Sequence, residues 1–159
     1  MDRCIFCQIH TGRAPASFVH ECDDFMAFMD IHPMRPGHVL VLPRRHRQHL
    51  HELPQQMRAR LFELGLAIGN AQRRLGADAV NYVINDGRAA NQTVAHLHLH
   101  VVPRRRGDTS RLIGRMLRKP LEPLLGPASR ERLNQQAHEL RATIKTMAGT
   151  REGGKAGKK

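Results

Sequence analysis

The chain has 159 residues and a formal net charge of +12, and its length suffices for one domain with a hydrophobic core and a short extension. No apolar run approaches the roughly 20 residues of a membrane-spanning helix, and the first residues have neither the basic start nor the apolar stretch of a secretion signal. These features argue against a membrane span and lead us to expect a cytoplasmic protein.

The positive charge is concentrated in the C-terminal third. The residues before position 103 include 11 Lys and Arg against 9 Asp and Glu, whereas residues 103–159 include 15 against 5. A segment of this sign attracts polyanions such as nucleic acid or polyphosphate. A solubilising extension without a specific partner explains the composition equally well, so both interpretations stay open here.

The N-terminal third is expected to form a short helix and then strands. Asp23 and Asp24 favour a turn between two short runs, and two prolines with a glycine make residues 31–37 a loop. The expected elements are a turn or short helix over Cys4–His10, a hairpin of Ser17–Glu21 with Phe25–Met29, and a central strand over His38–Pro43.

A long amphipathic helix follows. Pro54 suits the first turn of a helix, Gly76 ends the pattern, and between them apolar residues recur at spacings of three and four, at Met57, Leu61, Leu64, Ile68, Ala71 and Leu75. We expect this helix to cover one face of the sheet. A short strand over Val80–Ile84 and a polar loop over residues 85–93 come next.

The stretch Val94–Pro103 is expected to be the strand that carries the site. Strict alternation places His96, His98 and His100 on one face of the strand and apolar residues on the other. Alternate side chains of a strand lie about 6.6 Å apart, close enough to surround a phosphate or a metal. Because His is not a favoured strand residue, three in alternation indicate a function.

The rest of the chain is expected to be an appendage. A last helix runs from about Ser129 to Met147, and residues 149–159, which are rich in glycine and carry four basic residues, are expected to be disordered. We therefore divide the chain into a catalytic domain over 1–108, a basic extension with a helix over 109–148 and a tail. The elements predict an α+β fold with a mostly antiparallel five-stranded sheet and one long helix on it.

Two cysteines near the N-terminus form a C-x-x-C motif. In a reducing compartment the spacing of Cys4 and Cys7 is typical of a metal site or a redox pair and not of a structural disulfide. Two further ligands would complete a tetrahedral zinc site. A reduced pair without metal is the alternative.

The alternating histidines suit chemistry at phosphorus. A neutral imidazole is a good nucleophile toward phosphorus near pH 7, and a phosphorylated imidazole is a good leaving group. His98 has an imidazole on each side to align it and is therefore the expected nucleophile. The alternative is a metal-dependent hydrolase with the three histidines as ligands, although three ligands from one short strand would need an unusual geometry.

The run from His96 to Val102 resembles the H-φ-H-φ-H-φ-φ signature of the histidine triad family, in which φ is an apolar residue. Further positions in family order lie at Ile5-Phe6, at Phe28, Asp30-Ile31 and Pro33, at Gly37-His38 through His46, and at Asn85 with Gln92-Thr93-Val94. The resemblance covers residues 4 to about 108. It implies a nucleotide hydrolase or transferase that acts as a homodimer on a purine nucleotide.

The resemblance also implies a role for each matched residue. It implies His98 as the nucleophile, with His100 and His38 beside it, and Asn85, Gln92 and Thr93 at the phosphate. The nucleoside would lie against Ile5, Phe6, Phe28, Met29, Asp30 and Ile31. A structural zinc would be held by Cys4, Cys7, His46 and His96, an arrangement seen in bacterial-type members that begin with C-x-x-C.

The branch of the family stays open. Gln92-Thr93-Val94 and the residues from Pro103 to Asp108 resemble enzymes that cleave dinucleoside polyphosphates, whereas Asn85 resembles the nucleoside phosphoramidases. Asn91 stands where many members have glycine. A zinc-stabilised nucleic-acid-binding protein with a non-catalytic triad is a further alternative, in which the basic C-terminal part would be the functional one.

Overall fold

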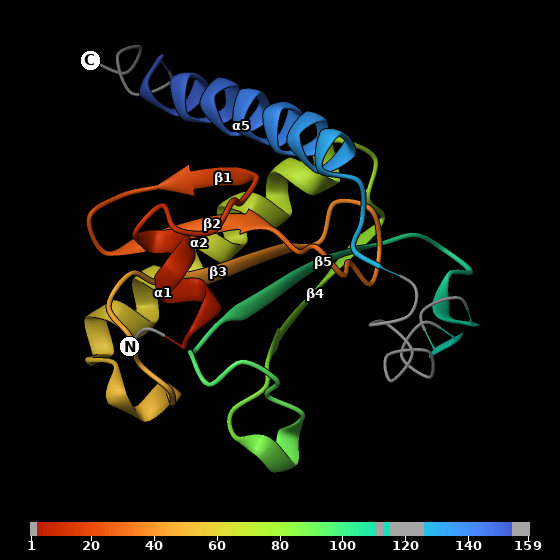
Figure 1. The fold of residues 1–159 in the computed structure, drawn as a ribbon. Coiled ribbons are helices and arrows are strands. Elements are labelled where there is room, and N and C mark those ends of the chain that lie inside the picture. The colour runs from red at the N-terminus through yellow and green to blue at the C-terminus, as the bar shows by residue number, and fades with distance from the viewer. Residues whose placement is uncertain (1–2, 111–112, 115–125, 154–159) are drawn as a thin grey trace.

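Five antiparallel strands form the centre of the computed structural model, which describes residues 3–110, 113–114 and 126–153 (Figure 1). In spatial order the strands are β1 (Phe18–Glu21), β2 (Phe25–Met29), β3 (Val39–Pro43), β5 (Leu99–Arg104) and β4 (Ala79–Ile84). Every neighbouring pair is antiparallel. The predicted α+β fold, with its five-stranded sheet, long helix and C-terminal helix, is confirmed.

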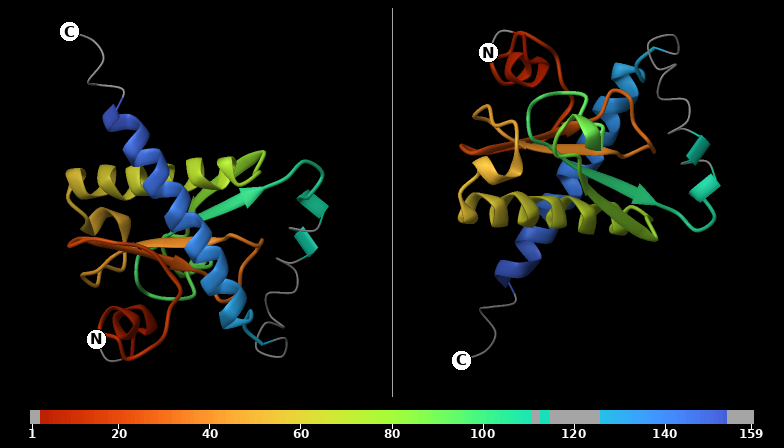
Figure 2. Two further views of the ribbon diagram at one scale, coloured as in Figure 1. Left: turned by 90° about the horizontal axis from the view of Figure 1, so that it is seen from above. Right: turned by 90° about the horizontal axis from the view of Figure 1, so that it is seen from below.

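The two faces of the sheet are covered differently. Helices α2 (Gln55–Arg74) and α5 (Arg130–Gly153) lie on one face, where Figure 2 shows α5 crossing α2, and the short helix α1 (Ile5–His10) lies on the other. Because strand residues alternate between faces, Ala27 and Val41 pack under the two long helices and Phe28 and Leu40 pack with α1. The α1 face is the one that carries the histidines.

Two glycines bring α2 close to the sheet. A Cβ at Gly65 would lie 2.6 Å from Cδ2 of Leu99, and a Cβ at Gly69 would overlap the ring of Tyr82. A side chain at either position would therefore force Leu99 or Tyr82, or the helix itself, to move. This close contact supports the strand from which His100 projects.

Helix α5 is part of the main core. Leu133, Ala137 and Leu140 are buried in the same apolar cluster as the residues beneath α2. The helix continues to Gly153, so the expectation of disorder from residue 149 was wrong for residues 149–153, while 154–159 lie outside the described residues. The division of the chain at residue 108 stays a prediction. No helix in the described part of the chain is long and apolar enough to cross a membrane.

The histidine strand begins later than expected. Strand β5 starts at Leu99, and residues 94–98 approach it as an irregular segment. The main-chain N–H of His96 donates to the carbonyl of Val94, and that of Leu97 donates to the carbonyl of Arg47, so this segment bonds to a loop and to itself in place of a neighbouring strand. Leu97, Leu99 and Val101 are nevertheless fully buried in the main core, as the alternation predicted.

Candidate functional site

A cavity of about 350 Å³ opens on the α1 face of the sheet. Its size lies in the range of small-molecule sites in proteins, and its walls are mostly apolar. Its lining includes all six residues predicted to contact a nucleoside, namely Ile5, Phe6, Phe28, Met29, Asp30 and Ile31, and it also includes Thr93, His98 and His100. The structure thus brings the predicted nucleoside residues and two of the predicted catalytic histidines to one cavity.

The ring of His98 has a defined orientation. Its Nδ1–H donates a hydrogen bond of 2.7 Å to the carbonyl oxygen of His96, and since a carbonyl can only accept, the neutral ring has its lone pair on Nε2. Phe6 packs edge-on against this ring, with the two centroids 5.2 Å apart. His98 is only 4% exposed. A buried imidazole with a fixed tautomer at the cavity wall has the properties of a nucleophile.

His38 and His100 are hydrogen-bonded to each other. Nε2 of His38 lies 3.0 Å from Nδ1 of His100, so one proton is held between the two nitrogens. The other nitrogen of His38, Nδ1, faces both the N–H of Met34 at 3.2 Å and the carboxylate of Asp30. The ring of His100 lies beside that of His98 at the same cavity, with centroids 4.7 Å apart.

Asp30 is held by two groups at the end of β2. One carboxylate oxygen accepts the N–H of His32 at 2.9 Å, and the other lies 3.2 Å from Nδ1 of His38. His38 is completely buried and does not line the cavity itself. It joins Asp30 to His100, so the predicted ribose acceptor and the predicted phosphate donor belong to one network.

Some predicted site residues lie elsewhere in the structure. Met29 reaches the cavity lining, but its side chain belongs to the core under the long helices because β2 alternates between faces. Asn85 and Gln92 are not among the described lining residues. The amide of Gln92 accepts the N–H of Gly87 and donates to the carbonyl of Gln48, so it closes the predicted phosphate loop.

Asn91 has the backbone conformation that favours glycine. Its φ is 63°, and it is the one residue other than glycine with positive φ in the described part of the chain. Asn tolerates this left-handed region better than most residues because its short side chain bonds locally. The departure from the family's glycine therefore preserves the turn between Arg88–Ala90 and the histidine segment.

A second cluster forms a candidate metal centre behind the cavity. One ligand atom from each of Cys4, Cys7, His46 and His96 lies within 4.8 Å of all the others. The sulfur of Cys7 lies 3.4 Å from Nδ1 of His46 and 3.7 Å from Nδ1 of His96. A tetrahedral zinc with Zn–S of about 2.3 Å and Zn–N of about 2.0 Å separates its ligands by about 3.6 Å, so the cluster fits this ion.

The protonation of the cluster also fits a metal. Nε2 of His96 donates to the carbonyl of Pro43 at 2.9 Å, which leaves the lone pair on Nδ1, the atom that faces the sulfurs. Burial lowers the pKa of His96 to about 4, so the ring is neutral near pH 7. Burial and the neighbouring Cys4 raise the pKa of Cys7 to about 11, so a bound metal would have to displace its proton.

The three triad histidines do not form one ligand set. Within the described residues, the groups that could hold a metal are the C-x-x-C cluster and the trio Asp30, His38 and His100. His96 turns toward the cysteines, while His98 faces the cavity. This separation weighs against a hydrolase that uses His96, His98 and His100 on one catalytic metal.

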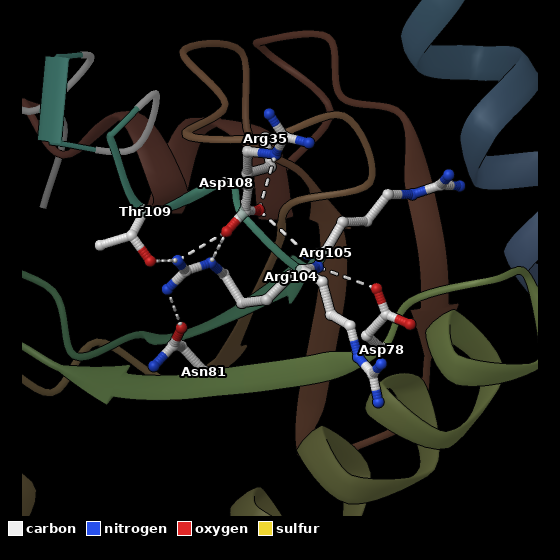
Figure 3. A network of polar contacts seen from close by, with 8 residues as sticks. Arg35, Asp78, Asn81, Arg104, Arg105, Asp108 and Thr109 are labelled. Atoms are coloured by element: carbon white, nitrogen blue, oxygen red, sulfur yellow. Dashed lines mark hydrogen bonds and ion pairs between the residues drawn. The ribbon is translucent and has the colours of Figure 1, made fainter.

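A network of ion pairs holds the loop that precedes His38 (Figure 3). Asp108 is 3% exposed and pairs with Arg104 at 2.7 Å and with Arg35 at 3.3 Å. The hydrogen bond from Arg104 lowers the pKa of Asp108 to about 2, so this pairing stabilises the fold above about pH 4 and is lost as the pH falls through about 2. The carbonyl oxygen of Arg35 accepts a hydrogen bond from the main-chain N–H of His38, and this bond connects the network to the site.

Sequence reasoning missed Arg130. This residue lines the cavity although it comes from the first turn of α5, which no motif connects to the site. An Arg in the first turn of a helix is unfavourable because it lies at the positive end of the helix dipole. This unfavourable position was the single signal in the sequence that could have pointed to a role for Arg130.

The antiparallel sheet, the buried histidines on β5 and on the segment that leads into it, and the apolar cavity beside them define a protein of the histidine triad architecture. A model of the HIT domain family matches residues 11–107, and the chain belongs to this family.

Relatives agree with this assignment along most of the chain. An uncharacterized HIT-like protein of Mycobacterium tuberculosis is 45% identical over 136 residues, which cover 84% of this chain and 94% of the relative. The crystal structure of a zinc-bound histidine triad family protein from Mycobacterium smegmatis is 36% identical, with a TM-score of 0.77 over 94% of this chain and 98% of that chain. The adenosine 5′-monophosphoramidase of Schizosaccharomyces pombe is 36% identical over 101 residues, 64% of this chain and 74% of the relative.

Proposed function

We propose that this protein is a nucleotide hydrolase or transferase that cleaves a bond to the α-phosphate of a purine nucleotide derivative. The orientation of His98 carries this proposal, because the bond from its Nδ1 to the carbonyl of His96 keeps the lone pair on Nε2 at the wall of the cavity. The cavity has apolar walls for a base and Asp30 for ribose hydroxyls.

The reaction proceeds in two steps. Nε2 of His98 attacks the α-phosphorus, a P–N bond forms, and the bond from phosphorus to the leaving group breaks. Water then attacks the same phosphorus, the P–N bond breaks, and a nucleoside monophosphate is released. His100, which is hydrogen-bonded to His38, lies beside His98 and would stabilise the negative charge that grows on the phosphoryl oxygens.

A substrate panel tests this function and identifies the branch. Adenosine 5′-phosphoramidate, diadenosine polyphosphates and adenylyl-lysine analogues share the α-phosphate and differ in the leaving group. The similarity to an adenosine 5′-monophosphoramidase favours the phosphoramidate. Release of AMP from at least one substrate supports the proposal, and nucleotide binding without release of AMP from any of them contradicts it.

We also propose that the C-x-x-C cluster holds a structural zinc. Four protein ligands close the coordination sphere, so the metal would fix the N-terminal segment beside His96 and would not activate water. The similarity to a zinc-bound family member supports this role. A cytoplasmic location, where the thiols stay reduced, remains part of the proposal.

We further propose a homodimer, as the family resemblance implies. Strand β4 lies at one edge of the sheet, and Phe62 and Leu66 of α2 are more than two-fifths exposed one helical turn apart. Sedimentation velocity is expected to give the mass of two chains, and Phe62→Glu with Leu66→Glu is expected to shift it toward one chain. A single-chain mass for the unaltered protein contradicts the dimer.

The basic C-terminal end is expected to be dispensable for turnover. Deleting residues 149–159 leaves the buried anchors Leu133, Ala137 and Leu140 of α5 in place, so hydrolysis of a small nucleotide substrate should be unchanged. Binding to RNA should weaken, and its decrease between about 50 and 200 mM salt should become less steep, because four basic residues are lost. Filter binding and turnover assays on the same preparations measure both effects.

The same experiment addresses the non-catalytic alternative. Salt-dependent binding of RNA without any nucleotide turnover would favour a nucleic-acid-binding protein. A severe loss of turnover on truncation would show instead that the C-terminal end contributes to the site.

A further inference from the structure

Arg130 brings a permanent positive charge to the wall of the candidate nucleoside cavity. Among the described lining residues it is the one Lys or Arg, and Asp30 is the one acid. It lies outside residues 11–107, which the family model matches. The triad signature therefore does not account for it.

The start of α5 is tied to two walls of the cavity. The N–H of Ala128 donates to the carbonyl of Ile31 at 2.8 Å, and the hydroxyl of buried Ser17 donates to Oδ1 of Asn134 at 2.6 Å. Figure 1 shows the light-blue coil that leads into α5 passing beside the loop that follows β2. These bonds, together with the buried Leu133 in the next turn, fix the backbone of Arg130 at the cavity.

Arg130 lies at the side of the cavity away from His98. Its Nη1 contacts the hydroxyl of Ser17, which directly precedes β1, whereas His98 directly precedes β5. Three strand spacings of about 4.8 Å separate β1 from β5, and the two strands run in opposite directions, so the two anchoring positions lie at least about 14 Å apart. A nucleotide that spanned the cavity from an α-phosphate at His98 would place its base toward Arg130 and the apolar segment at residues 14–16.

The protein makes little use of the Arg130 guanidinium. Within the described part of the chain its one hydrogen bond is the 3.4 Å contact to Ser17, and no carboxylate lies within ion-pair distance. The positive end of the α5 dipole also disfavours a cation in this turn. Arg130 is partly exposed, and the N–H donors that its guanidinium has beyond the bond to Ser17 can serve a ligand with acceptors in the cavity that Arg130 lines.

We infer that Arg130 is a specificity-determining residue that favours a 6-oxopurine nucleotide over an adenine nucleotide. Guanine and hypoxanthine present two adjacent acceptors, O6 and N7, which match the planar fork of a guanidinium, whereas adenine presents an amino donor at the same position. This inference rests on the proposed function, since it takes the cavity to hold a purine nucleotide with its phosphate at His98.

Calorimetric titration with GMP, IMP and AMP tests the inference without requiring turnover. The unaltered protein is expected to bind GMP and IMP about tenfold more tightly than AMP, as for a bidentate Arg pair with O6 and N7. Arg130→Met should reduce this preference to less than about twofold, and Arg130→Lys, which keeps the charge without the fork, should leave a smaller preference. Arg132→Met, an exposed position two residues along α5, is the matched control and should leave it unchanged.

The outcomes separate the inference from the proposed function. Equal affinities for the three nucleotides in the unaltered protein, or an equal loss of all three in Arg130→Met with unchanged melting temperature, would overturn the inference. If AMP release from the substrate panel persists in that case, the proposed function stands. If selective binding depends on Arg130 but no substrate is cleaved, the inference stands and the catalytic proposal fails. Binding of none of the three nucleotides would overturn both.

Discussion

His98→Ala is expected to reduce turnover by more than about 10³-fold while nucleotide affinity stays within about tenfold. The substitution removes the atom that would form the covalent bond and leaves the apolar walls and Asp30 in place. Steady-state kinetics on the best substrate of the panel and equilibrium binding of the product monophosphate measure the two quantities separately.

His98→Gln is the matched variant for this experiment. Glutamine restores much of the side-chain volume beside Phe6 but supplies no nucleophilic nitrogen, so turnover should stay low while melting temperature returns toward that of the unaltered protein. Near-normal turnover in either variant would end the assignment of His98 as nucleophile. A detectable nucleotidyl-protein intermediate in the unaltered chain, absent from both variants, would support it directly.

Removing a cysteine of the C-x-x-C cluster is expected to have the second large effect. The purified protein should contain about one zinc per chain. Cys4→Ser or Cys7→Ser should weaken zinc binding by more than about 100-fold, which is more than the loss expected when a residue that only hydrogen-bonds to a metal ligand is replaced. The melting temperature should fall, because metal binding contributes to the stability of the folded state. Metal analysis and thermal unfolding measure the two effects.

Cys22→Ser is the control for the zinc experiment. Cys22 is half-buried and its sulfur contacts the carbonyl of Phe25, far in sequence from the cluster, so metal content should not change. Protein purified without chelators and found free of zinc would favour the reduced cysteine pair. Immediate loss of turnover in EDTA without unfolding would show that the metal takes part in catalysis and would contradict a structural role.

Period-two alternation predicted the main features of the site because it has few structural interpretations. It correctly placed Leu97, Leu99 and Val101 in the core, which leaves the histidines for the opposite face. The alternation could not show that β5 starts only at Leu99. The start of the strand depends on the hydrogen-bond partners of the main chain at residues 94–98, and these partners lie in a loop and in the segment itself. The irregular segment directs His96 to the cysteines and leaves His98 at the cavity.

Long-range pairings were beyond the sequence pattern. The sequence indicates only a basic stretch at residues 104–108. In the structure Asp108 is buried and pairs with Arg35, which lies 73 positions earlier in the chain, so this pairing follows from the fold alone. The contribution of α5 to the cavity was missed for the same reason, because the helix had to dock before Arg130 could reach it. The helix was predicted from its apolar spacing, but its place in the main core was not.

Helix α1 has only six residues and serves both centres of the molecule. Cys7 belongs to the metal cluster, while neighbouring Phe6 packs against His98 and Phe28 at the nucleoside cavity. A zinc ion at the proposed metal centre and a nucleotide in the proposed cavity would therefore contact the same short helix. Thermodynamic reciprocity then requires that any factor by which zinc tightened nucleotide binding equal the factor by which nucleotide tightened zinc binding, so a coupling between the two proposed centres could be measured from either side.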